Sequence, residues 1–245
     1  MEIGLGFVIA IAIALTGVGA GSLTTPLLIL LLGVPAAESV GTALIFGAVV
    51  KVITAPVYMF RGQVNRRALG FLLAGGLPGV LAGSFLLHGM RSSVMMGLLG
   101  FTIMTVALLN LFHFSRTGPR RDRTNWLTAV ALPIGAEVGF SSAGSGALGA
   151  LSLLSLTPLD AAAVVGTDLC FGLALSIVGG GIHAALGSLN MVVLVKLLIG
   201  GVPGALTGAM LASRLPSKQL RFALSLAMAV LGAHICWKGL SGAGL

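Results

Sequence analysis

Residues 75–83 read GGLPGVLAG, and residues 200–208, placed 125 positions later, read GGVPGALTG. Shorter markers outside these two stretches keep the same spacing without a gap: Gly41 and Thr42 with Gly166 and Thr167, and Gly62 and Asn65 with Gly187 and Asn190. An ordered series of matches at one spacing indicates an internal repeat. Chance could supply a single glycine match, but it does not supply the whole series.

The repeat divides the chain into two homologous halves. We predict a first half over 1–115, a basic cytoplasmic linker over 116–124 and a second half over 125–245. The linker contains the sequence RTGPRRDR. Further upstream in each half a glycine-rich stretch recurs more loosely, as GVGAGSLTTP from Gly17 and as GFSSAGSGAL from Gly139.

The composition of the chain identifies lipid as its main solvent. Of 245 residues, 57% are hydrophobic and only 8% are charged, with a mean hydropathy of +1.09, whereas soluble domains are about 25% charged. The net charge of +8 does not indicate nucleic acid as a partner. The basic residues stand in short clusters between long apolar stretches, which is typical of cytoplasmic loops in a multi-pass membrane protein.

The hydrophobic runs predict an all-α integral membrane protein. A helix needs about 20 apolar residues to cross a bilayer, and six runs reach or approach this length: 37–60, 68–87, 94–112, 161–185, 191–212 and 219–236. Four shorter runs form two pairs, each interrupted by glycine and small polar residues: 4–16 with 22–32, and 126–138 with 146–156. Each half therefore contains one interrupted pair and three spanning helices.

The orientation of the halves depends on these pairs. If each pair forms one broken spanning helix, the chain crosses eight times and the halves run parallel. If each pair is a re-entrant hairpin, the chain crosses six times and the halves are inverted, with both termini outside. The second arrangement leaves only Arg91 and Lys238 away from the other basic residues of loops and ends. The positive-inside rule therefore favours inverted halves.

The glycine-rich breaks are candidate binding sites. Non-helical backbone at membrane depth is tolerated only where protein or a water-filled cavity lines it, and helix N-termini direct free N–H groups toward anions. The predicted substrate-binding residues are the glycines and hydroxyl residues at the breaks, with Lys51 and the threonines of the following helices: Gly17, Gly19, Gly21, Ser22, Thr24, Thr25, Thr42, Lys51, Ser141, Ser142, Ser145 and Thr167. The competing interpretation is close helix packing by small residues.

Ionisable residues inside apolar segments are costly and are therefore functional candidates. Lys51 would attract an anion, and Asp168 would carry a coupling proton or pair with Lys51. A purely structural ion pair is the alternative. Glu137 and His183 are the further candidates for ion coupling, although an interfacial position is the simpler explanation for His183.

Other chemistry receives little support from the residues. Cys170 and Cys236 lie in apolar runs without metal-ligand spacing, so we expect neither a disulfide framework nor a metal site. The sequence contains no nucleotide-binding loop, and we expect no cofactor. Small-residue faces such as Gly75–Gly83 pack either within one chain or between two copies, which leaves a homodimer open.

The run GVGAGSLTTPLLILLLGVPAAESVGTAL at 17–44, followed by RGQVN at 61–65 and GGLPGVLAG, resembles the TauE/SafE family of sulfite and sulfonate exporters. The second half repeats the pattern in VVGTDL, GSLN and GGVPGALTG. The resemblance implies a transporter of the inner (cytoplasmic) membrane that moves small sulfur-containing anions such as sulfite, thiosulfate or sulfoacetate, mostly outward. Asp168 departs from the pattern, because the family's GTS-like motif has serine there.

These observations lead to one main hypothesis and two alternatives. The main hypothesis is a secondary transporter, with or without proton coupling, that exports or exchanges sulfur anions by alternating access around the two breaks. A passive anion channel would conduct without counterflow. An intramembrane enzyme is the weaker alternative, because no metal motif and no convincing histidine base accompany the serines.

Overall fold

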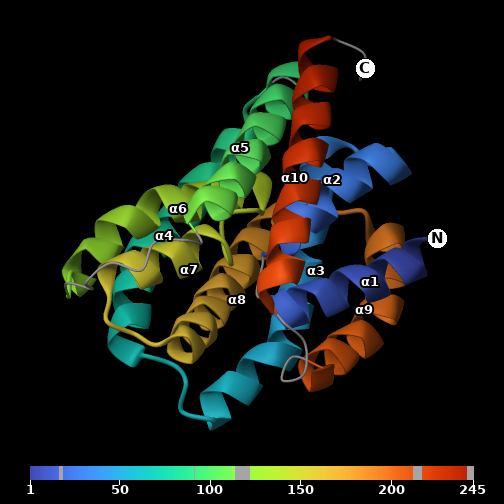
Figure 1. Cartoon of the computed structure of the whole chain (residues 1–245). Coiled ribbons are helices and arrows are strands. Elements are labelled where there is room, and N and C mark those ends of the chain that lie inside the picture. Colours follow the sequence, from blue (N-terminus) through green and yellow to red (C-terminus); the bar gives the residue numbers. More distant parts are fainter. Residues whose placement is uncertain (17–18, 91, 114–121, 212–216, 242–245) are drawn as a thin grey trace.

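The computed structural model describes residues 1–16, 19–90, 92–113, 122–211 and 217–241, and all regular structure in these ranges is helical (Figure 1). The helices of the first half are α1 (Glu2–Thr16), α2 (Ala20–Leu32), α3 (Ala36–Phe60), α4 (Arg66–His88) and α5 (Ser92–His113). The 3₁₀ turn η1 (Thr124–Trp126) leads into α6 (Leu127–Ser141), α7 (Leu148–Leu156), α8 (Ala161–Ala185), α9 (Met191–Leu211) and α10 (Ser217–Leu240). Of the predicted linker, only residues 122–124 belong to the described ranges.

The predicted all-α membrane fold is confirmed. Within the described residues, α3, α4, α8, α9 and α10 are long and apolar enough to cross a bilayer. The helix α5 is the sixth predicted span, and its apolar stretch Val94–Leu109 is somewhat shorter. The helices α1, α2, α6 and α7 are the short elements that the sequence predicts at the two breaks.

Side-chain caps fix where the long helices begin. The Asn65 side chain accepts a hydrogen bond from Ala68 N at the start of α4, and the Asn190 side chain accepts one from Val193 N at the start of α9. Asp160 caps α8 in the same way, through Ala163 N. Each cap satisfies one of the N–H groups that a helix leaves free at its first turn.

The helices α3 and α8 lie against each other in opposite directions at the centre of the molecule. Gly41, near the start of α3, contacts His183 near the end of α8, and Gly166, near the start of α8, contacts Tyr58 near the end of α3. The helices α5 and α10 are also antiparallel, because Gly100 lies beside Cys236 and Gly232 lies beside Met104. In both pairs, the helices that stand at equivalent places of the predicted repeat run in opposite directions.

The two GGxPG stretches provide flat surfaces for short helices from the other half. On α4, Gly75 and Gly79 pack against the backbone of Thr128 and Leu132 on α6. On α9, the glycines at the equivalent positions pack against the backbone of Ile3 and Phe7 on α1: Gly200 and Gly204. The contacts recur at the spacing of the sequence match, which agrees with the predicted two-part organisation.

Each of the two hydrophobic clusters contains one buried aromatic ring. Phe171 on α8 packs against Gly76 of α4, and Phe46 on α3 packs against Gly201 of α9. Both rings are fully buried. These clusters hold α3 and α8 in place, and the candidate site lies along the contact between these two helices.

Candidate functional site

The two glycine-rich breaks meet inside the molecule. Gly19 and Gly21, at the start of α2, lie against the backbone of Ser145 and the side chain of Ser142 in the second break, so closely that neither position has room for a Cβ atom. Thr25 Oγ1 and Ser142 Oγ are 2.6 Å apart and share a hydrogen bond. Gly17 lies outside the described residues.

The second break is a polar loop between α6 and α7. Ser142 ends α6 in the left-handed conformation at φ 63°, and Gly146 adopts φ 97° just before α7. Such φ values turn the chain sharply and favour glycine. Ser141 Oγ accepts a hydrogen bond from Ala143 N at 3.2 Å and donates one to Glu137 Oε1 at 2.5 Å.

Lys51 is the buried cation of the site. Its ammonium donates to Ser145 Oγ at 3.1 Å, to the Gly172 carbonyl at 3.1 Å and to Ser176 Oγ at 3.0 Å, and the residue is only 3% exposed. An ammonium group has three donors, so these partners occupy all of them. In this conformation protein groups surround the Lys51 ammonium.

Asp168 supplies the buried anion of the site. Its Oδ1 accepts a hydrogen bond from Gly146 N at 3.4 Å, and it lies so close to Gly149 that no Cβ would fit there. The Asp168 carboxylate also attracts the Lys51 ammonium electrostatically. We refer to Lys51, Ser145, Asp168, Gly172 and Ser176 as the Lys51 cluster.

The other predicted binding residues divide into two groups. Ser22 and Thr24 are fully buried on α2, near the breaks, and the Ser22 hydroxyl donates to the Gly19 carbonyl at 2.6 Å. Thr42 and Thr167 lie at contacts between the halves. Thr42 accepts a hydrogen bond from the backbone N–H of Asn190, and Thr167 accepts one from the backbone N–H of Asn65. Thr42 lies about 13 Å from Lys51 along α3, from the rise per residue. These two threonines join the halves instead of lining the Lys51 cluster.

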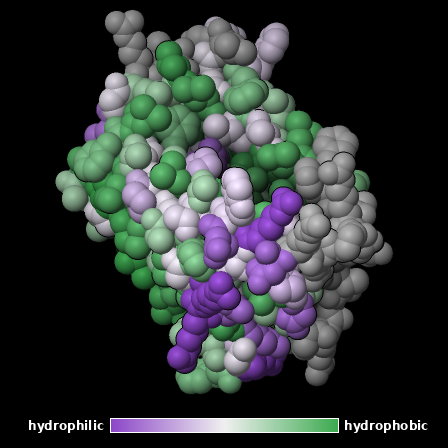
Figure 2. All heavy atoms as spheres, turned by 90° about the vertical axis from the view of Figure 1, so that its left-hand side faces the viewer, coloured by the Kyte–Doolittle hydropathy of each residue, from purple (hydrophilic) through white to green (hydrophobic). Residues whose placement is uncertain are grey.

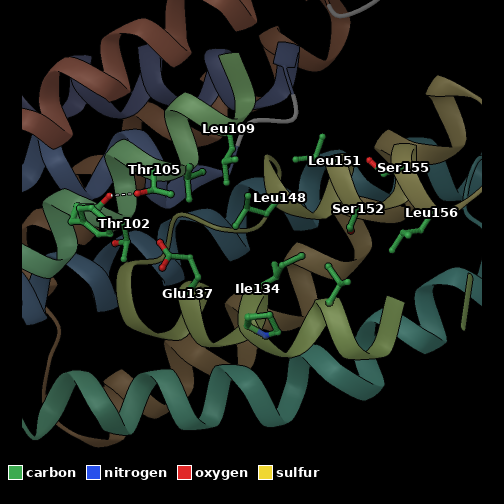
Figure 3. Close-up of a pocket in the computed structure, with 14 residues that line it drawn as sticks. Thr102, Thr105, Leu109, Ile134, Glu137, Leu148, Leu151, Ser152, Ser155 and Leu156 are labelled. Atoms are coloured by element: carbon green, nitrogen blue, oxygen red, sulfur yellow. Dashed lines mark hydrogen bonds between the residues drawn. The ribbon is translucent and has the colours of Figure 1, made fainter. Parts of the chain in front are cut away.

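Glu137 faces a lateral cavity of about 520 Å³ between α5, α6 and α7 (Figure 3). The lining is mostly apolar, and its polar members besides Glu137 are four hydroxyl residues: Thr102, Thr105, Ser152 and Ser155. The Glu137 carboxylate points into the space beside Thr102. Through Ser141 it is also hydrogen-bonded to the second break.

His183 lies in the last turn of α8, away from the Lys51 cluster, and is fully buried. Its Nε2 is 3.0 Å from the Gly139 carbonyl in the last turn of α6. Its Nδ1 has no hydrogen-bond partner among the described residues. The ring centroid of the exposed His88 is 6.3 Å away.

Two members of the Lys51 cluster, Gly172 and Ser176, are absent from the residues that the sequence predicts. Ser176 carried a usable signal, because it follows Lys51 by 125 residues and is therefore its equivalent in the second half. Gly172 contributes only a carbonyl oxygen, and a carbonyl leaves no mark in the sequence.

The helices and the site together define a multi-pass α-helical membrane protein with two interrupted helix pairs around a buried charge, which is the architecture of a membrane transporter. A family model described as "Sulfite exporter TauE/SafE" matches residues 3–235. The chain therefore belongs to the TauE/SafE family, as the sequence motifs predict.

Curated relatives agree with this membership. The "Probable membrane transporter protein YjnA" of Bacillus subtilis is 28% identical over 247 residues, covering 94% of this chain and 97% of the relative. A "Probable membrane transporter protein" of Xylella fastidiosa is 26% identical, covering 97% and 95%. No solved structure matches the chain significantly. The family and these relatives are membrane transporters, so the chain is a transporter and not an enzyme.

Proposed function

We propose that this protein is a secondary transporter of the cytoplasmic membrane that exports or exchanges small sulfur-containing anions at the Lys51 cluster. The observation that carries the proposal is the buried Lys51 ammonium, which α3 holds against the second break and α8. A buried cation in a membrane protein is expensive and marks a pathway for charged solutes. The name of the matching family directs the choice of substrate toward sulfite and related anions.

The proposed binding step exchanges protein acceptors for substrate oxygens. Ser145 and Ser176 accept hydrogen bonds from Lys51 in the closed conformation. Oxyanions accept hydrogen bonds strongly from charged donors. A sulfite or sulfonate group would take the place of these hydroxyls on the ammonium, and the freed hydroxyls would then donate to the substrate. Asp168 would balance the Lys51 charge when no substrate is bound.

The proposed transport step is a movement of α3 relative to α8. These helices are antiparallel and stand at equivalent places of the predicted repeat, so the contacts at the two ends of the pair are similar. Separating the helices at one end would therefore be equivalent to separating them at the other. Inverted halves provide two such equivalent conformations. The antiparallel pairs α3 with α8 and α5 with α10 support the inverted arrangement over the parallel one.

Counterflow in proteoliposomes tests this function directly. Vesicles containing the purified protein are preloaded with sulfite, thiosulfate, sulfoacetate, taurine, sulfate or chloride, and uptake of the same labelled anion is measured. We expect trans-stimulated uptake of one sulfur anion and none of chloride. Current without counterflow would indicate the channel alternative, and no exchange of any sulfur anion by folded protein would refute the substrate class.

Glu137 is the proposed site of proton coupling. Its carboxyl bonds the Ser141 hydroxyl, and Ser142, which follows, bonds Thr25 of the first half. Protonation converts a carboxylate from an acceptor into a donor, so it would change the hydrogen bonds of the second break.

The Glu137→Gln variant is expected to keep exchange at equal pH but to lose the acceleration by an imposed pH gradient, because glutamine preserves the shape and binds no proton. The measurement is counterflow with and without the gradient. Thr105→Val is the matched control, since Thr105 lines the same cavity and its hydroxyl donates to the Phe101 carbonyl. Gradient acceleration that survives in Glu137→Gln would exclude Glu137 as the coupling residue.

A further inference from the structure

A small polar cavity lies where α4 and α6 begin, far from the two breaks along both helices. Its volume is about 220 Å³, and its lining consists of Arg67 from α4 and five consecutive residues that lead into α6: Asp122, Arg123, Thr124, Asn125 and Trp126. The transport pathway proposed above does not use these residues, although Asp122, Arg123 and Thr124 belong to the predicted basic linker.

Among the described residues, the lining of the cavity carries an excess of one positive charge. Two arginines, Arg67 and Arg123, and one acidic residue, Asp122, line it. Hydrogen bonds from the Thr124 side chain and backbone, together with the nearby Arg67 charge, hold the pKa of Asp122 below its usual range. Asp122 is therefore ionised at neutral pH, and the cavity is complementary to a monoanion.

An exposed tryptophan borders the cavity. Trp126 is 65% exposed at the beginning of α6, and exposed tryptophan is typical of the membrane interface. The first residues of α6 lie at the left of Figure 1, on the side that Figure 2 turns toward the viewer. Figure 2 shows hydrophilic residues gathered in one area of this side, with hydrophobic surface to their left.

We propose that this cavity binds the phosphodiester headgroup of an anionic phospholipid. Guanidinium groups bind phosphate oxygens through two parallel hydrogen bonds, which favours arginine over lysine at such sites. One phosphodiester carries one negative charge, which equals the excess charge of the cavity. The acyl chains would then extend along the apolar surfaces of α4 and α6, beside the Trp126 ring.

Bromine on acyl chains quenches tryptophan fluorescence at contact, so lipid exchange at Trp126 can be measured. The chain has two tryptophans, and the Trp237→Phe background leaves Trp126 as the sole reporter. The purified protein is reconstituted in phosphatidylcholine nanodiscs with increasing brominated phosphatidylglycerol, or with brominated phosphatidylcholine for comparison. We expect the anionic lipid to quench Trp126 at much lower mole fractions than the neutral lipid.

Removing a positive or a negative charge from the cavity is expected to change the preference for anionic lipid in opposite directions. Arg67→Gln is expected to weaken the preference for phosphatidylglycerol about five-fold, since each arginine near an anionic surface contributes about 1 kcal/mol. Asp122→Asn keeps the acceptor oxygen for Thr124 and should strengthen the preference by a similar factor. Arg61→Gln removes an exposed charge that does not line the cavity, and we expect it to change the preference least.

Three results would overturn the proposal: equal quenching by the two lipids, equal effects of Arg61→Gln and Arg67→Gln, or loss of lipid quenching on adding millimolar glycerol phosphate. The second result would indicate diffuse surface charge, and the third would indicate a site for soluble anions. The lipid measurement requires no transport, so its outcome is independent of the proposed substrate.

Discussion

Replacing Lys51 by methionine is expected to abolish anion exchange while the protein still inserts into the membrane. Methionine has a similar length without the charge, so it removes the donor for the substrate and for Ser145 and Ser176. Removing one partner of a buried ionic group costs about 3–5 kcal/mol. If that loss falls on substrate binding, exchange at low substrate concentration should fall by about 100-fold or more. Counterflow at several substrate concentrations measures the effect.

A paired variant separates the functional role of Lys51 from its structural role. In Lys51→Met the Asp168 carboxylate loses its buried cation, so the thermal stability in detergent should fall. The double variant Lys51→Met with Asp168→Asn removes both charges and should recover much of that stability without recovering exchange. Exchange near the wild-type rate in the folded double variant would show that the cluster is a structural ion pair, the alternative that the sequence left open.

The helix boundaries were largely predictable because apolar length and glycine interruptions are local properties of the sequence. The predicted segment 161–185 coincides with α8, and the segment 37–60 differs from α3 by a single residue. The short helices were less accurate, since α7 begins at Leu148 and not at Gly146. There the backbone N–H of Gly146 donates a hydrogen bond to the carboxylate of Asp168 on α8. A contact with a distant helix cannot be predicted from the local sequence pattern.

The site was only partly predictable because its partners come from distant segments. Lys51 stands out as an ionisable residue in an apolar run, but its bond to Ser176 depends on the antiparallel contact of α3 and α8. Thr42 and Thr167 were conspicuous because they recur in both halves. The structure gives a different reason for that recurrence, since each accepts a hydrogen bond from the opposite half. Repeated polar residues in a two-part fold therefore indicate contacts between the halves as readily as binding.

The cavity beside Glu137 could not be predicted from the repeat. Its polar residues have no polar equivalents in the opposite half: at the same spacing Ala12 corresponds to Glu137, and Ala227 corresponds to Thr102. A polar cavity without a counterpart at the equivalent place breaks the symmetry of the predicted repeat. Glu137 is also hydrogen-bonded to the second break through Ser141, so it is a better first target than His183 for a mutational test of coupling.

Alanine at Gly166 is expected to destabilise the protein strongly, although alanine favours helices over glycine. A Cβ at this position would collide with the Gln63 carbonyl in the loop after α3 and come within 3.1 Å of Tyr58 Cβ on α3, so this loop and the end of α3 would have to move away from α8. Overpacking typically costs about 1–3 kcal/mol and occasionally more, and a rigid backbone carbonyl places this contact at the upper end. The measurement is the thermal unfolding of the purified variant in detergent.

Gly181→Ala on the same helix is the matched control for Gly166→Ala, because a Cβ there meets no atom within 4 Å. Both substitutions gain the same intrinsic helix propensity, about 1 kcal/mol. The difference between their thermal stabilities therefore isolates the contact of α8 with the end of α3 and the loop after it. Gly41→Ala should cost as much as Gly166→Ala, since Gly41 meets the Ser188 carbonyl at the equivalent place in the other half. Equal stability of Gly166→Ala and Gly181→Ala would mean that α3 and α8 do not pack at this distance. The alternating movement proposed for these two helices would then lose its structural basis, because it requires them to separate at one end while they remain in contact at the other.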